Sequence, residues 1–312
     1  MRYAVISDIH GNLPALEAVL CDAKDHGFDG YIFAGDYCLS GPYPDQCIEL
    51  LRSIDNKYII RGNEERYLEN LIDKDQSLWL DGQMQISYWT YKNTSRENVD
   101  YLMTLPHRLD LEINGTGIHI SHFSSDFIGE KELPVWGSTV IATGGAGEDL
   151  TRVKLDDFIC GLIDSDAEIR ETMDGLADGV YIFGHSHIQW TYKHKDRNIY
   201  LLNPGSCGLP LDGITGSIPY AILDISEDGK VDIELKRLPF DMASYVDELK
   251  KTSQFSEAKV WSNVIIKELT TAKEHVAFFL EFTSKYADQI GDDRRPFALD
   301  TWETAFEKWD RS

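Results

Sequence analysis

The sequence predicts an α/β fold, and two observations lead to this prediction. Short apolar runs of the buried-strand type alternate with helical patterns up to residue 61, which is typical of parallel strands covered by helices. Further strand-like runs follow between residues 109 and 236. The 312 residues suffice for one large domain of this class, or for such a domain with an appendage.

The chain is expected to begin in a βαβαβ order. The strands are residues 3–7, 31–34 and 58–61, and the helices between them are residues 13–23 and 46–53. Residues 64–105 then have a helical pattern rich in aromatic side chains. Asn114-Gly115 and Asp228-Gly229 each predict a hairpin turn. The later strands are expected at residues 109–113, 117–121, 180–183, 190–193, 200–202, 220–225 and 231–236.

The last quarter of the chain is expected to be helical. Two sets of apolar residues repeat at helical spacing, and each predicts a packing face rather than a cofactor site. The sets are Trp261, Ile265, Leu269, Ala272, Val276, Leu280 and Ala287, and then Trp302, Phe306 and Trp309. These faces either cover the side of the main domain or join two copies in a homodimer, because residues 292–296 form a break that would let the last helix reach outward. No metal ligand is expected here, since the only histidine is His275.

The composition excludes several kinds of partner. A formal net charge of −23 disfavours nucleic-acid polymers and anionic membranes. The five cysteines form no CxxC pair, and no apolar run is long enough for a signal peptide or a membrane span, so a cytoplasmic location is expected. The glycine-rich stretch 143–147 lacks the ending of a phosphate-binding P-loop and is expected to be a mobile loop.

Five short motifs stand where strand-like runs end, and each carries side chains that can bind a metal ion. They are Asp8-Ile9-His10, Gly35-Asp36, Gly62-Asn63, Ser121-His122 and Gly184-His185-Ser186-His187. The carboxyl ends of parallel strands gather along one edge of a sheet, so the motifs should meet there. In Asp-x-His and His-x-His, residues two apart on an extended chain point the same way and can hold one ion. The glycines are expected to let the backbone turn sharply.

The candidate ligands together suit two divalent cations. They are Asp8, His10, Asp36, Asn63, His122, His185 and His187. Four imidazoles, two carboxylates and one amide oxygen form a donor set of the borderline-hard kind. One carboxylate must bridge the two ions, and Asp36 is the natural candidate because it lies between the Asp8/His10 motif and Asn63.

These motifs resemble the signature of the calcineurin-like metallophosphoesterases, which runs D-x-H, G-D, G-N, a lone H and G-H-x-H. The resemblance spans residues 8–187, and Asn203-Pro204-Gly205-Ser206 resembles a turn of the small bacterial members, among them diadenosine tetraphosphate hydrolases. It implies a four-layer α/β/β/α sandwich over residues 1–240, a helical insert at about 64–108 and a C-terminal helical extension at 241–312.

The resemblance also implies a binuclear metal centre, with Mn²⁺ expected and Fe, Zn or Co as alternatives. One ion would be held by Asp8, His10, Asp36 and His187, and the other by Asp36, Asn63, His122 and His185. His122 is preferred to His119 because it directly follows the strand end. A hydroxide between the ions would attack phosphorus while Asn63 contacts the phosphate, so no side-chain nucleophile is expected.

One position departs from the family pattern. Glu64 stands where many members carry a histidine that assists the leaving group. Its carboxyl is either an ionised, poor proton donor beside the ions or a structural residue turned away from the site. A missing donor favours good leaving groups, so small phosphodiesters and nucleotide phosphoanhydrides are the expected substrates. The alternatives are a protein serine/threonine phosphatase and a non-catalytic metal-binding scaffold for protein interactions.

Overall fold

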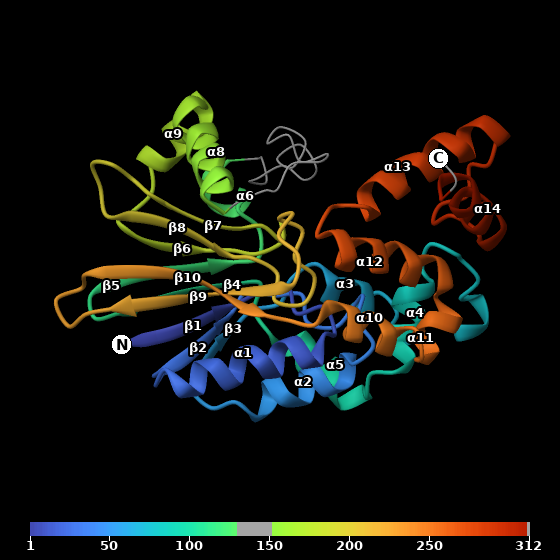
Figure 1. Ribbon diagram of the computed structural model, residues 1–312, viewed down its shortest axis with the longest axis horizontal. Helices are drawn as coiled ribbons and strands as arrows, with labels where there is room; N and C mark the ends of the chain where they lie inside the picture. Colours follow the sequence, from blue (N-terminus) through green and yellow to red (C-terminus); the bar gives the residue numbers. More distant parts are fainter. Residues whose placement is uncertain (130–151, 311–312) are drawn as a thin grey trace.

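Two five-stranded mixed sheets face each other at the centre of the computed structural model, which describes residues 1–129 and 152–310 (Figure 1). The first sheet has the order β10-β9-β1-β2-β3, with β10 at Val231–Pro239, β9 at Ser217–Ile225, β1 at Arg2–Ile6, β2 at Gly30–Phe33 and β3 at Lys57–Ile59. The second has the order β4-β5-β6-β8-β7, with β4 at Arg108–Ile113, β5 at Thr116–Ser121, β6 at Gly179–Ile182, β8 at Ile199–Pro204 and β7 at Gln189–Lys193.

Helices cover the outer faces of both sheets. The first sheet is covered by α1 at Leu13–Asp25, α2 at Pro44–Ser53 and α5 at Arg96–Thr104. The second is covered by α8 at Arg152–Ser165 and α9 at Ala167–Asp174, with the short α6 at Ser125–Ile128 beside them. The predicted four-layer α/β/β/α arrangement is therefore confirmed (Figure 1).

Side-chain alternation gives each sheet two apolar faces. In β1, Val5 is buried between the sheets, whereas Ala4 and Ile6 pack toward α1 and α2. In β6, Ile182 faces the first sheet and Tyr181 packs toward α8 and α9. Because successive residues of a strand point to opposite faces, strands that are buried on both sides must be apolar throughout. This is why they stand out in the sequence as continuous apolar runs.

Both predicted hairpins are present. Asn114 has a φ of 50° and Gly115 a φ of 78°, so both occupy the left-handed region that a two-residue turn of the right twist requires. This turn joins β4 and β5, which pair in antiparallel register. β9 and β10 also pair antiparallel, with Gly229 at a φ of 78° in the loop between them.

A helical lobe is built jointly from the insert and the C-terminal helices (Figure 1). It consists of α4 at Gln85–Lys92, α10 at Met242–Leu249, α11 at Ser253–Glu257, α12 at Lys259–Thr271, α13 at Val276–Ile290 and α14 at Leu299–Trp309. The insert also contains α3 at Glu64–Glu69 and one 3-10 turn at Gln76–Leu78. The Gln83 carbonyl accepts from Trp261 Nε1 at 2.6 Å, and the Gln83 N–H donates to the Phe297 carbonyl at 3.1 Å. These bonds join segments that are far apart in the sequence.

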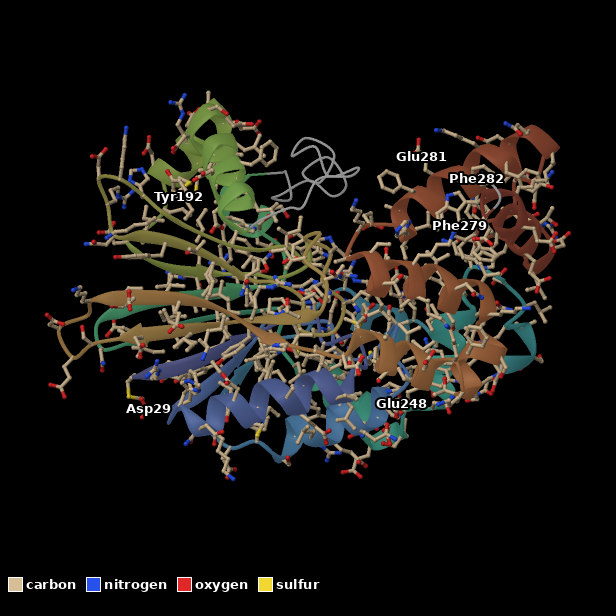
Figure 2. All side chains as sticks on the ribbon, in the orientation of Figure 1. Asp29, Tyr192, Glu248, Phe279, Glu281 and Phe282 are labelled. Carbon is tan, nitrogen blue, oxygen red and sulfur yellow. The ribbon has the colours of Figure 1, made fainter. Side chains whose placement is uncertain are left out.

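The first set of apolar residues in the last quarter of the chain, Trp261 to Ala287, lies on two helices and not on one continuous helix. α12 ends because Ala272 adopts a left-handed backbone with a φ of 51°, and the Gly213 N–H donates to its carbonyl at 2.7 Å. α13 then begins at Val276. Phe279 of α13 packs against Trp302 and Phe306 of α14, so these apolar faces cover each other within one chain (Figure 2). Homodimerisation through these helices stays a prediction.

Two further expectations concern features outside the sheets. The glycine-rich stretch 143–147, expected to be a mobile loop, lies outside the residues that the structure describes. Within residues 1–129 and 152–310, no helix has both the length and the apolar composition that crossing a bilayer requires.

The core of the helical lobe can be tested at Trp302, whose side chain is fully buried. Trp302→Ala removes contacts with Phe279 and Phe297 and leaves a cavity, so the free energy of unfolding should fall by about 3 kcal/mol or more. Phe278→Ala is the control, because Phe278 is 41% exposed, and it should change that free energy by less than about 0.5 kcal/mol. Urea unfolding measures both values. Equal effects would contradict this packing.

Candidate metal centre

All seven candidate ligands lie at the edge where the strands of both sheets end. They follow β1 (Asp8, His10), β2 (Asp36), β3 (Asn63), β5 (His122) and β6 (His185, His187). Asn63 and His185 are partly exposed, and the other five are buried. The structure therefore brings together the residues that the sequence motifs singled out.

The first group of donor atoms comes from Asp8, His10 and His187. The Nε2 atoms of the two imidazoles lie 2.9 Å apart. Asp8 Oδ1 lies 3.5 Å from His187 Nε2 and 3.9 Å from His10 Nε2. Three such donors converging on one point can hold a divalent ion.

The second group comes from Asp36, His122 and His185, whose donor atoms lie within 4.8 Å of one another. His122 Nε2 is 3.1 Å from Asp36 Oδ2 and 3.0 Å from Asn63 Oδ1. Asp36 also forms a group of the same size with His10 and Glu64. Its carboxylate thus belongs to the second group and also lies close to His10 of the first group.

The outer nitrogens of three imidazoles are bound to protein acceptors. The contacts are His122 Nδ1 to the Ala34 carbonyl at 2.7 Å, His187 Nδ1 to the Leu209 carbonyl at 2.8 Å and His10 Nδ1 to the Glu64 carboxylate at 3.0 Å. With Nδ1 protonated, each ring presents the lone pair of Nε2 to the centre. Neutral imidazoles fixed in this way, together with two buried carboxylates, fit divalent metal ions.

Five of the seven candidate ligands have a left-handed backbone. The φ values are 54° for Asp8, 52° for His10, 59° for Asp36, 65° for His185 and 57° for His187. This conformation costs residues with a Cβ about 1–3 kcal/mol each and persists only where the surroundings enforce it. Because the strain is concentrated at one centre, it indicates a functional site rather than a requirement of folding.

Two of the motif glycines are needed for close approach and not for a turn. Gly62 and Gly184 lie outside the left-handed region. A Cβ on Gly62 would lie 2.1 Å from Asp36 Oδ1, and a Cβ on Gly184 would lie 2.5 Å from Asp8 Oδ2. The expected sharp turn thus stays a prediction at these two positions, whereas Gly35 has the left-handed backbone of such a turn, with a φ of 101°.

The buried histidines and carboxylates of the centre shift the pKa values of one another. Burial alone would lower the pKa of His122, but Asp36, Asp8 and the Ala34 carbonyl together raise it to about 10. Burial likewise opposes protonation of His10, yet Glu64, Asp36 and Asp8 together raise its pKa to about 9. For Asp36, burial raises the pKa, but His122 and then His10 hold it well below its usual range.

Glu64 faces the centre and holds His10 in position. One carboxylate oxygen accepts from His10 Nδ1, and the other accepts from the Leu39 N–H at 3.0 Å. The reading in which Glu64 turns away from the site is therefore wrong. A carboxylate behind a ligating imidazole fixes the orientation and tautomer of the ring.

Glu65 supports the centre from behind, and the sequence motifs did not identify this role. Its side chain is fully buried and accepts from the N–H groups of Gly62 at 2.7 Å and Tyr37 at 2.8 Å. It thereby joins the loops that carry Asn63 and Asp36. An acidic residue in the first turn of a helix is ordinarily exposed and interacts with the helix dipole. Glu65 differs from such residues by its burial, which the sequence does not show.

The Asn203-Pro204-Gly205-Ser206 turn ties the ligand loops together. Asn203 Nδ2 donates to the Gly184 carbonyl at 2.7 Å, and Ser206 Oγ donates to the Asp8 carbonyl at 2.7 Å. The turn therefore links the loop after β1 to the loop after β6. Its role is to position main chain, because both bonds end on carbonyl groups.

The remaining histidines of the described residues lie away from the centre. His119 Nδ1 contacts Asp110, and its ring stacks on Tyr181 with centroids 4.6 Å apart. This arrangement agrees with a structural role for His119. The others contact different parts of the surface, namely His26 with Asp22, His107 with Arg61, His194 with Asp174 and His275 with Thr271.

Comparison with known families gives one match over most of the chain. The profile described as "Calcineurin-like phosphoesterase superfamily domain" matches residues 1–228. An uncharacterized protein of Methanocaldococcus jannaschii, MJ0912, is 29% identical over 263 residues, which cover 80% of this chain and 91% of that protein.

Two solved structures are similar in fold. A metallophosphoesterase from Sphaerobacter thermophilus has a TM-score of 0.58 at 22% identity and covers 87% of this chain and 99% of its own. The hypothetical protein PH1004 from Pyrococcus horikoshii OT3 has a TM-score of 0.59 at 17% identity and covers 88% of this chain and 99% of its own. These likenesses concern the fold alone.

Gly62→Ala should displace Asp36, because the added Cβ would lie 2.1 Å from Asp36 Oδ1 and 2.8 Å from its N atom. We expect bound metal to fall by at least half while the far-ultraviolet circular dichroism stays unchanged. Gly161→Ala is the matched control, since a Cβ there meets nothing within 4 Å. Elemental analysis after dialysis measures the effect. Full metal content in Gly62→Ala would contradict this geometry.

Metal binding should release protons and tighten with rising pH. With pKa values of about 9 and 10, His10 and His122 are protonated at neutral pH in the metal-free protein, and only neutral imidazole binds a metal. Affinity should rise about tenfold per pH unit for each proton displaced, between about pH 6 and pH 8. Calorimetry in buffers of different ionisation enthalpy counts the protons. His122→Asn should lower the slope, His119→Gln should not, and a pH-independent affinity would refute the assignment.

Proposed function

This chain belongs to the calcineurin-like phosphoesterase superfamily, and on that premise we propose that it is a binuclear metal-dependent hydrolase of small phosphodiesters or nucleotide phosphoanhydrides. Membership itself indicates a metal-dependent hydrolase that acts on phosphoesters. The observation that carries the finer proposal is that the Asp36 carboxylate belongs to the second group of donor atoms and also lies close to His10 of the first group. Mn²⁺ is the metal proposed for both groups, with Fe, Zn or Co as alternatives.

The proposed ligands of the two ions are the two groups, with Asp36 added to the first because it also lies close to His10, and Asn63 added to the second. Asp8, His10, Asp36 and His187 would hold one ion, and Asp36, Asn63, His122 and His185 would hold the other. When bound, divalent ions lower the pKa of water and polarise the phosphoryl group. The protein contributes buried donor atoms whose directions are already set by main-chain carbonyls and by Glu64.

Asn63 is proposed to contact the phosphoryl group. Its Oδ1 atom lies 3.0 Å from His122 Nε2, so the carbonyl end of the amide belongs to the second group of donors. The amide nitrogen at the other end is a hydrogen-bond donor suited to a phosphoryl oxygen. Asn63 also lines the cavity that adjoins the centre, which supports this contact.

The Ser7 hydroxyl and the Cys38 thiol, which lie beside the ligand loops, are engaged or inert. Ser7 is fully buried and its Oγ donates to the Ala34 carbonyl at 3.3 Å. Burial, followed by the charge of Glu65, raises the pKa of the Cys38 thiol well above its ordinary value. These observations support water, rather than a side chain, as the nucleophile.

The surroundings of Glu64 favour substrates with good leaving groups. Both of its oxygens already accept hydrogen bonds, from His10 and from Leu39, so it is poorly placed to protonate a departing oxygen. A protein serine/threonine phosphatase must expel an alkoxide and is therefore the weaker proposal. The net charge of −23 supports small-molecule substrates over nucleic-acid polymers and anionic membranes. A cytoplasmic location stays a prediction.

The proposal is tested by metal analysis and by turnover of a nitrophenyl phosphodiester. We expect close to two metal ions per chain, activity that is lost to a chelator and restored by Mn²⁺, and slower turnover of phosphoserine. Asp36→Asn should lower kcat/KM by at least about a hundredfold, because it weakens both positions. Asp110→Asn, which touches only the outlying His119 and Arg108, should not. A protein that binds two ions and hydrolyses neither substrate would be the scaffold.

A further inference from the structure

A cavity of about 210 Å³ begins at the metal centre and runs between the sandwich and the helical lobe. At one end it is lined by candidate ligands, among them Asp36, His185 and His187. The other end is lined by the C-terminal helices and the turn between them, including Trp261, Val276 and Leu280. The lobe therefore forms a wall of the space that adjoins the reacting centre.

Part of the cavity wall is apolar. Ile86 of α4, Leu209 and Leu211 of the loop after β8, and Leu280 of α13 come from three distant parts of the chain. Such a surface favours a hydrocarbon or ring-bearing group over water. A phosphoryl group held at the metal centre would place its organic substituent here.

Two buried acids also line the cavity. Glu268 is 1% exposed and Glu274 is 5% exposed, and both line the cavity. One oxygen of Glu268 accepts from the Val276 N–H at 2.8 Å, and one oxygen of Glu274 accepts from the Ala277 N–H at 2.6 Å. The two carboxyl groups also form a hydrogen bond with each other.

Capping of α13 does not by itself explain why both residues are acids. Burying two neighbouring carboxyl groups is unfavourable, and a smaller residue such as Ser could cap the helix at lower cost. Burial, and for Glu268 also the neighbouring Glu274, raises the pKa of both groups. A ligand that brings N–H groups into the cavity would add donors to these carboxyl oxygens.

Resting on the proposed function, we propose that this cavity holds the organic group of the phosphoester substrate. We propose further that Glu268 and Glu274 select a group with N–H donors on an apolar body, as in a nucleobase or an arylalkyl amine. A carboxylate or a second phosphate beside this pair would bring acceptor oxygens against acceptor oxygens and is disfavoured. The C-terminal helices are thus a specificity element, although they supply no metal ligand.

The test measures binding of simple phosphonates to the full-length, Mn²⁺-loaded protein by calorimetry. Methylphosphonate reports on the metal centre alone. Benzylphosphonate should bind about tenfold more tightly because its ring enters the apolar section. Para-aminomethylbenzylphosphonate should gain about another tenfold, and the para-carboxy analogue should bind more weakly than the benzyl compound. An acyclic adenine phosphonate is compared with the amine, and the tighter of the two identifies the source of the N–H donors.

Variants assign the preference to the two acids. Glu268→Gln and Glu274→Gln keep an oxygen for capping α13, and each should bring the amine-to-benzyl affinity ratio close to one. Glu281→Gln is the matched control, because Glu281 lies on the outer side of α13 and is 61% exposed (Figure 2). It should retain the wild-type ratio. If a variant folds poorly, the relative affinities of the phosphonate series for the wild-type protein still test the proposal.

Two outcomes would overturn this inference in distinguishable ways. If methylphosphonate binds and the nitrophenyl diester is hydrolysed, but the benzyl and amine compounds bind no more tightly than methylphosphonate, the cavity does not take the organic group. In that case the proposed function survives. If no phosphonate binds and no diester is hydrolysed, the metal centre does not hold phosphoryl groups, and both proposals fail.

Discussion

The carboxylate of Asp36 is the group around which the site is arranged. It lies 3.1 Å from His122 Nε2 on one side, groups with His10 on the other, and accepts from the Glu64 N–H at 2.9 Å. Its place requires that Gly62 lack a side chain and that its own backbone be left-handed, with a φ of 59°. Close packing, strain and charge therefore all converge on one buried side chain.

Hydrogen bonds from the surrounding protein hold three of the imidazoles and two of the ligand loops in place. Main-chain carbonyls of Ala34 and Leu209 hold two imidazoles, and Glu64 holds a third. Glu65 joins two ligand loops through their N–H groups. Because these supports are buried and directional, the donor atoms need little rearrangement to meet a cation. These contacts fix the loops at the ends of the two sheets in one arrangement.

The helical lobe is coupled to the same centre through the loop after β8. Within this loop the Leu209 carbonyl accepts from His187, and the Gly213 N–H donates to the carbonyl of Ala272. Ala272 ends α12 and so sets where α13 and its two buried acids begin. A single loop thus positions a candidate ligand and the far wall of the cavity. The loop after β8 therefore connects the metal centre to the C-terminal helices that line the cavity.

The sequence was sufficient for the α/β class and for the cluster of candidate ligands, because both depend on local patterns, whereas the four-layer sandwich came from the family resemblance. Buried strands must be apolar on both faces, and a strand that ends in Asp-x-His or His-x-His delivers its side chains to the shared edge of the sheet. What residues close in the chain cannot reveal is which distant groups they meet. The support of His10 by Glu64, the break of the tail at Ala272 and the meeting of Glu268 with the cavity all depend on long-range packing. Such contacts depend on how the folded layers pack together, so the spacing of residues within a helix or strand does not predict them.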